Sequence, residues 1–297
     1  MHPRLGSALL AAALSVSIAL ARRPAIAQRP PAATPGVPLA PANFVRDLRR
    51  QCPQRPATAA SATPPTLTPP SFQWLTWGLA GPPVANAFPA IDREYSVAAR
   101  LLRQTLSTDP AFGALALRVA RLLRERLLLA DGRHDAAEAS NATRELERLL
   151  AEVIERLGTD PNIDQMLFLR ARALTSLGDM AGARRGYFML IQRFPSSPYV
   201  PAAYFNFGAY FIESGDRSSA LQFFHRVLQF GPATNALWVP ALLRVAEIQR
   251  LDGNRTAANA SFASLALALA NDPTRLDRAM LEAAALDGFC STLAPHP

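Results

Sequence analysis

From Ile91 onward, apolar residues recur at the three- and four-residue spacing of an α-helix, and Gly, Asp and Pro interrupt this pattern at intervals. Alanine and leucine dominate the sequence, and alternating apolar and polar runs, which are typical of strands, are absent from it. The pattern therefore predicts an all-α fold. The expected helices span residues 91–107, 111–130, 135–157, 162–177, 179–194, 199–214, 216–230, 235–251, 254–270 and 273–292.

Two kinds of residue pair mark the expected helix boundaries. In the first kind, Asp caps a helix whose first position is Pro; these pairs are Asp109-Pro110, Asp160-Pro161 and Asp272-Pro273. In the second kind, Gly lies just past one helix and a capping residue begins the next; these pairs are Gly178-Asp179, Gly215-Asp216 and Gly253-Asn254. The second kind predicts tight turns between antiparallel helices.

The turn glycines belong to an internal repeat, because 37 residues separate Gly178 from Gly215 and 38 separate Gly215 from Gly253. Small residues lie seven before and five after each glycine, and aromatic residues lie nine after it. These columns contain Ala171, Gly208 and Ala246; Ala183, Ala220 and Ala258; and Tyr187, Phe224 and Phe262. Small residues let paired helices approach closely, and each pair leaves an apolar face that the next pair covers. The repeat therefore predicts antiparallel helix pairs stacked as an α-α superhelix.

The second copy resembles the tetratricopeptide (TPR) family in the run from Tyr204 through Gly208 and Gly215-Asp216 to Ala220, Phe224 and Pro232. The usual period of the family is about 34 residues, and the additional residues here fall in the loop between repeats. That loop is similar to the variant in bacterial cell-envelope TPR proteins, such as the Tol-Pal coordinator, outer-membrane assembly lipoproteins and myxobacterial periplasmic proteins. The resemblance covers about residues 165–270. It implies a TPR-like solenoid that binds other proteins.

Residues 91–158 are expected to be helical but fit the repeat less well. Gly132 is a candidate fourth turn glycine, yet Asn141 stands nine residues later, where the repeat has an aromatic residue. We therefore expect divergent repeats or a capping bundle at 91–158, three TPR-like repeats at 159–271, and a C-terminal capping helix and tail at 272–297.

The resemblance also implies a peptide-binding groove. In TPR proteins the first helix of each pair lines the concave surface, and ligands contact positions thirteen, ten, six and three residues before the turn glycine. The matching residues are Gln165, Phe168, Arg172 and Thr175; Ala202, Phe205, Ala209 and Ile212; and Pro240, Leu243, Glu247 and Arg250. The middle set is apolar and the outer sets are mixed, which suits a short peptide with hydrophobic anchors. The alternative is that Phe205 and Ile212 are covered by helices of the same chain.

The first residues have the parts of a secretory signal peptide at 1–27. A positive start at Arg4 precedes an apolar stretch over 5–21, and Ala25-Ile26-Ala27 forms a cleavage site before Gln28. Cysteine is absent near this site, so we expect no lipid attachment there. The sequence predicts a periplasmic or secreted protein; the alternative is an uncleaved N-terminal membrane anchor.

A proline-rich region follows the signal peptide. Residues 28–70 contain eleven prolines and predict a disordered arm, with one short helical patch at 43–51 that Asn43 would cap. An aromatic and Pro-rich connector at 71–90 contains Phe72, Trp74 and Trp77. These aromatic residues either dock in a partner or pack within the chain on the first helix of the solenoid, where they would seal its open end.

The two cysteines, Cys52 and Cys290, lie far apart in the sequence. In an oxidising compartment such a pair predicts a disulfide; the alternative is two unpaired thiols. The formal net charge of +8 comes from arginines that are scattered singly, so the sequence does not indicate a nucleic-acid partner.

The sequence gives no motif for catalysis. None of the four histidines, which are His2, His134, His225 and His296, has metal-ligand spacing to another candidate ligand. Nucleophile, phosphate-loop and dinucleotide motifs are absent. We therefore expect no enzyme activity, metal, cofactor or small-molecule substrate. The predicted function is a protein-interaction scaffold with a protein or peptide partner in the cell envelope; the alternative is a self-associating structural or assembly component.

Overall fold

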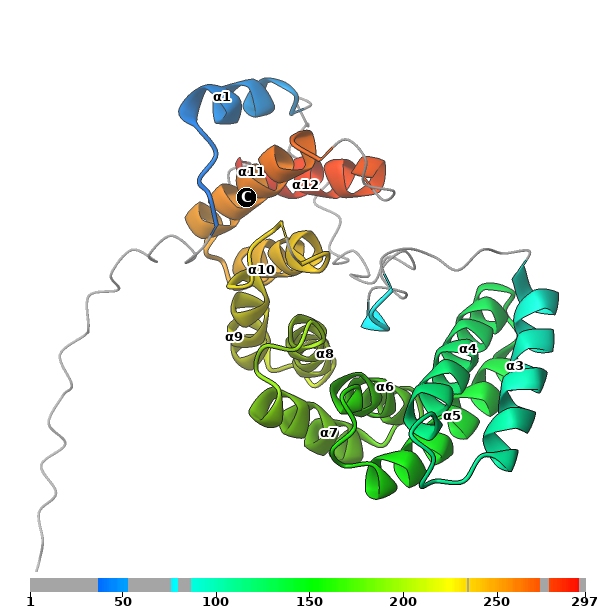
Figure 1. Ribbon diagram of the computed structural model, residues 1–297. Helices are drawn as coiled ribbons and strands as arrows, with labels where there is room; N and C mark the ends of the chain where they lie inside the picture. The colour runs from blue at the N-terminus through cyan, green and yellow to red at the C-terminus, as the bar shows by residue number, and fades with distance from the viewer. Residues whose placement is uncertain (1–36, 53–75, 80–86, 234, 273–277, 294–297) are drawn as a thin grey trace, which may run out of the picture. The chain divides into compact units, whose positions relative to one another are not determined.

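The computed structural model describes residues 37–52, 76–79, 87–233, 235–272 and 278–293, and over these residues the chain is all-helical (Figure 1). Eleven helices and no strand occur in this described part, which confirms the expected all-α class. The predicted signal peptide, most of the proline-rich arm, Phe72, Trp74 and the last four residues of the expected C-terminal tail lie outside the described residues.

The helix bounds agree closely with the sequence pattern. The helices are α1 (Ala42–Arg50), α3 (Phe88–Gln104), α4 (Phe112–Gly132), α5 (Ala136–Arg156), α6 (Ile163–Ser176), α7 (Met180–Arg193), α8 (Val200–Glu213), α9 (Arg217–Leu228), α10 (Trp238–Leu251), α11 (Arg255–Ala270) and α12 (Arg278–Leu293). Every expected boundary between 91 and 270 lies within three residues of the observed one.

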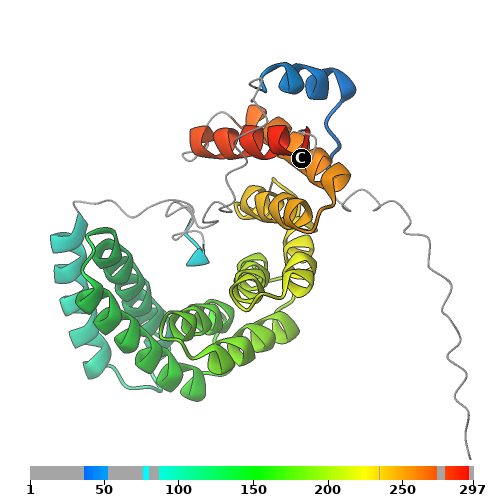
Figure 2. The same cartoon turned by 180° about the vertical axis from the view of Figure 1, so that it is seen from behind.

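Consecutive helices pack in pairs, and the pairs stack in chain order as an α-α solenoid (Figures 1 and 2). The pairs are α4 with α5, α6 with α7, α8 with α9 and α10 with α11, while α3 packs on α4 and α12 on α11. Each second helix also contacts the first helix of the next pair. This arrangement covers the apolar face that an isolated helix pair leaves exposed.

The predicted glycine turns are confirmed. Gly178, Gly215 and Gly253 have φ angles of +82°, +80° and +76°, which residues with a Cβ rarely adopt. The following Asp or Asn caps the next helix, because its side chain accepts a hydrogen bond from the backbone N–H three residues later. These turns bring each pair together in an antiparallel way.

A fourth turn of this kind lies between α4 and α5, but Gly132 does not form it. Gly132 is the last residue of α4, and the left-handed residue is His134, at φ +59°. Asp135 then caps α5 by accepting from the N–H of Glu138 at 3.0 Å. The prediction of Gly132 as the turn residue is therefore wrong by two positions. The residue nine after the true turn is Thr143, which is buried.

The Asp-Pro pairs precede their helices by a full turn instead of capping them. Asp109 Oδ1 accepts from the N–H two residues later at 2.8 Å, and Asp160 Oδ1 does the same at 2.8 Å. The prolines therefore lie in these side-chain turns, and α4 and α6 begin at Phe112 and Ile163. The expected Asp caps with Pro at the first helical position are wrong at both sites, and Pro273 lies outside the described residues.

The predicted disulfide between Cys52 and Cys290 is present, with its Cα atoms 5.5 Å apart. It connects the end of α1 to α12. The helix α1 also packs on α11, and its Leu48 is buried. The short helical patch in the proline-rich arm is confirmed as α1. Asn43 lies inside this helix and makes no capping bond, so its predicted capping role is wrong.

Small residues in the repeat columns permit close helix packing. A Cβ added to Gly208 would lie 2.7 Å from the ring of Phe224, so any side chain there would displace that ring. The alanine columns and the aromatic column are almost fully buried, which agrees with the predicted pairing of the helices.

Candidate functional site

The predicted groove residues fall into different environments. Phe205 packs against Phe224 of its own helix pair, with ring centroids 5.2 Å apart and only 4% of Phe205 exposed. Helices of the same chain therefore cover Phe205, as the alternative interpretation of the groove expected.

The other predicted groove residues are buried or half-buried to different degrees. Thr175 Oγ1 lies 3.4 Å from the hydroxyl of Tyr187 in α7, and Ala209 and Ile212 are half-buried. In the third copy Pro240, Leu243 and Glu247 are buried and Arg250 is half-buried.

Residues Thr76–Leu79, here called the Trp77 segment, lie against the first helices of three pairs. Trp77 is buried at 1% exposure. Hydrogen bonds reach the segment from side chains on α4, α6 and α8. Of the two interpretations of the aromatic region, packing within the chain is thus the one seen for Trp77. The hydrogen-bond donors to the segment come from α4, α6 and α8, which we call the inner helices. The sequence had instead predicted packing on the first helix of the solenoid.

Arg172 of α6 lies over the Trp77 ring. Its guanidinium carbon lies 4.7 Å from the ring centroid, within the range of a cation–π contact. Its Nε donates to Thr76 Oγ1 at 3.4 Å, and its Nη1 donates to Ser176 Oγ at 3.0 Å. A residue that the TPR resemblance places in the groove thus contacts the aromatic segment.

Two further side chains bind the main chain of the segment. Arg124 of α4 donates from Nη1 to the carbonyl oxygen of Trp77 at 3.4 Å. Asn206 of α8 donates from Nδ2 to the carbonyl oxygen of Thr76 at 3.3 Å and to that of Ala202 at 2.8 Å. The segment is therefore held by its backbone as well as by its ring.

Gly78 allows the segment to lie close to α6. Its φ angle is +73°, and a Cβ built on it would lie 3.1 Å from Phe168 Cε1 and 3.3 Å from Tyr199 Cε1. Phe168 and Tyr199 stack on each other with ring centroids 5.1 Å apart. We call Arg124, Phe168, Arg172, Tyr199 and Asn206 the inner-face cluster.

Positive charge in the cluster is poorly solvated. Burial lowers the pKa of Arg124 and of Arg172, because desolvation disfavours the charged guanidinium. Arg124 Nε is buried and has no hydrogen-bond partner. The carboxylates of Glu213 and Asp131 raise the pKa of Arg172 in part, and that of Glu125 does the same for Arg124. The acceptors that both guanidiniums meet are neutral oxygens and a ring.

The sequence analysis missed Arg124, Tyr199 and Asn206. Arg124 stands ten residues before His134, the same offset at which Phe168 precedes Gly178, so the two-residue error at Gly132 concealed it. Arg121, thirteen before His134, donates to Gln165 at 2.5 Å. The available signal for Asn206 is a lone polar residue among aromatic ones in α8.

A second buried charged group lies on α10. Arg244 Nη1 and Glu247 Oε2 are 3.5 Å apart, and the side chains are only 8% and 7% exposed. Neither of these two atoms makes a hydrogen bond. Burial raises the pKa of Glu247 to about 7, while the charges of Arg244 and Arg250 lower it in part. This pair is contained within one helix.

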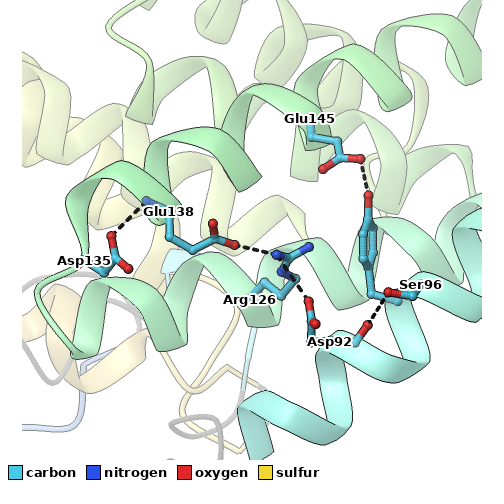
Figure 3. A network of polar contacts seen from close by, with 7 residues as sticks. Asp92, Ser96, Arg126, Asp135, Glu138 and Glu145 are labelled. Atoms are coloured by element: carbon cyan, nitrogen blue, oxygen red, sulfur yellow. Dashed lines mark hydrogen bonds and ion pairs between the residues drawn. The ribbon is translucent and has the colours of Figure 1, made fainter.

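A third polar network joins α3, α4 and α5 (Figure 3). Arg126 Nη2 lies 2.7 Å from Glu138 Oε1 and 3.3 Å from Asp92 Oδ1, and its guanidinium also lies over the ring of Tyr95. Tyr95 donates to Glu145, and burial together with this carboxylate raises the Tyr95 pKa. Because every charge here has a partner in a neighbouring helix, we assign the network a structural role.

None of the helices that the structure describes is long and apolar enough to span a bilayer. Over the same residues, no three His, Cys, Asp or Glu side chains gather as a metal site. No family model matches the chain, and no curated protein matches it.

Proposed function

We propose that this protein is an exported interaction scaffold that binds a peptide segment of a cell-envelope protein on the first helices of its helix pairs. One observation carries the proposal: the inner-face cluster holds a stretch of chain outside the solenoid helices by two main-chain carbonyls and one aromatic ring. A surface with these contacts suits a peptide from another protein. In this proposal the protein acts by binding and has no catalytic role, cofactor or small-molecule substrate.

Two further features support the setting of the proposal. The signal-like sequence at 1–27 supports export, and the disulfide supports an oxidising compartment, because disulfides persist outside the cytosol. The spacing of the glycine turns and the small residues beside them support membership of the TPR family, in which such surfaces bind peptides.

Site-specific photo-crosslinking in living cells tests the binding face. A photoreactive amino acid is placed at Ile212 of α8, a predicted groove position, and in a matched chain at Phe188 of α7, which is 56% exposed. We expect a discrete adduct at position 212 that is absent at position 188. Mass spectrometry then identifies the partner.

The same experiment distinguishes an external partner from the alternative function, which is self-association of the chain. An adduct of twice the mass of the chain would indicate self-association in place of an external partner. Equal adducts at both positions, or adducts at position 188 alone, would contradict binding on the inner helices, and so would the absence of any adduct at position 212.

A further inference from the structure

The Trp77 segment contacts the cluster through a Trp ring, a Gly turn and main-chain carbonyls, and other peptides can offer these groups as well. The ring of Trp77 lies 4.7 Å from the guanidinium carbon of Arg172. Two carbonyl oxygens of the segment accept hydrogen bonds at 3.3 and 3.4 Å, and Gly78 turns the chain where a side chain would meet an aromatic ring. Any peptide with Trp followed by Gly presents the same groups.

The segment offers only neutral acceptors to the two guanidiniums of the cluster. Arg172 Nε donates to the neutral hydroxyl of Thr76 at 3.4 Å, and the buried Nε of Arg124 makes no hydrogen bond within the described part of the chain. Residues 71–81, which include the segment, contain no Asp or Glu. A carboxylate accepts shorter bonds from a guanidinium, about twice as strong as those of a neutral acceptor. A ligand with a carboxylate at the position of Thr76 would therefore bind this cluster more tightly.

We propose that the Trp77 segment is a built-in ligand of the inner-face cluster, and that the external partner is a peptide with an acidic residue directly before a Trp-Gly pair, which displaces the segment. This inference rests on the proposed function, because it names the partner chemistry for the same surface.

A built-in ligand has a measurable consequence for affinity. The segment is covalently attached, so it competes at a high effective concentration. The external peptide binds only those molecules whose cluster is open, and its observed affinity falls by that open fraction. Removing the ring of Trp77 raises the open fraction, so it tightens external binding although it removes an apolar contact from the protein.

The test uses the full chain and its Trp77→Ala variant with three fluorescent peptides that copy residues 73–81 (QWLTWGLAG). The first peptide has the natural sequence, the second carries Thr76→Asp and the third carries Trp77→Ala. We expect anisotropy titrations to show the Thr76→Asp peptide binding the variant chain about 10-fold more tightly than the natural chain. On the variant chain it should bind about 5-fold more tightly than the natural peptide.

A second substitution assigns the charge effect to Arg172. In the Trp77→Ala chain, the further change Arg172→Gln should make the natural and Thr76→Asp peptides bind equally. Circular dichroism checks that each variant keeps its helical content. Gly78→Ala provides an independent way to release the segment with the Trp77 ring still present, so the test does not depend on one variant alone.

Two outcomes would overturn the inference. If the Trp77→Ala and Gly78→Ala chains are folded and bind all three peptides alike, the segment is not a ligand of the cluster. If light scattering shows a dimer of the natural chain that Trp77→Ala dissociates, the displacing segment comes from a second copy and not from an external partner. Crosslinking at position 212 is independent of these peptides, so an adduct there would leave the proposed function standing.

Discussion

The helices α6 and α10 place charged residues at matching positions but neutralise them differently. Arg172 and Glu247 each stand six residues before the turn glycine of their pair. Glu247 pairs with Arg244 of its own helix at 3.5 Å, whereas Arg172 contacts the ring and hydroxyl of a segment that is distant in sequence. The partner of Glu247 therefore lies on the same helix, whereas Arg172 makes its direct contacts with a segment that is distant in sequence and interacts with the more remote charges of Glu213 and Asp131.

Breaking the local pair should have the largest effect. Arg244→Met leaves the buried Glu247 carboxylate without its cation, and we expect the free energy of unfolding at pH 8 to fall by about 3 kcal/mol. The matched change Arg172→Met removes two hydrogen bonds to neutral hydroxyls and one ring contact, and should cost about 1 kcal/mol. Urea denaturation of the two variants measures both values.

Equal losses for these two variants would contradict the contrast between α6 and α10. The double variant Arg244→Met with Glu247→Leu serves as a control, because it removes the isolated charge. It should recover most of the stability that Arg244→Met loses.

The pH dependence of stability tests the same pair by a smaller effect. Burial raises the pKa of Glu247 from its ordinary 4.5 to about 7. Between these two pH values the folded protein holds a proton that the unfolded chain has lost, so its free energy of unfolding falls as pH rises through this window. Glu247→Gln removes this dependence. Relative to the variant, the natural chain should lose about 2 kcal/mol between pH 5 and pH 8.

Urea denaturation at several pH values measures the difference between the two chains, which cancels the contributions of other carboxylates. A difference that stays constant from pH 5 to pH 8 would show that the Glu247 carboxyl titrates normally. Arg172→Gln, which leaves the α10 pair intact, should preserve the pH dependence of the natural chain.

Most of the fold was predictable because its signals are local. Two adjacent residues, a glycine past a helix end and a capping residue after it, predict each turn, as at Gly215-Asp216. The helical spacing of apolar residues predicts the helices between the turns. The error at Gly132 has a physical reason. His134 adopts the left-handed conformation, which His tolerates better than most residues, but composition alone does not mark it.

The inner-face cluster was only partly predictable. The repeat register identified Phe168 and Arg172, whereas the error at Gly132 hid Arg124. The position of Trp77 could not be predicted, because the contact between Arg172 and Thr76 spans 96 residues and no periodic pattern connects the two. Such contacts depend on the assembled solenoid, which brings side chains of α4, α6 and α8 onto one segment.

The smallest expected effect comes from Gly78→Ala, which tests whether docking of the Trp77 segment affects α6 but not α10. Gly78→Ala places a Cβ 3.1 Å from Phe168 Cε1 and forces alanine into a left-handed conformation that costs about 1 kcal/mol. Because the cost falls on docking of the Trp77 segment, hydrogen-exchange protection of its amides should drop about 10-fold while the α10 amides stay unchanged. The control is Gly132→Ala, whose Cβ meets no atom within 4 Å. A loss of protection that extends to α10 would mean that the segment is an integral part of the fold, and that α6 and α10 do not differ in their dependence on it.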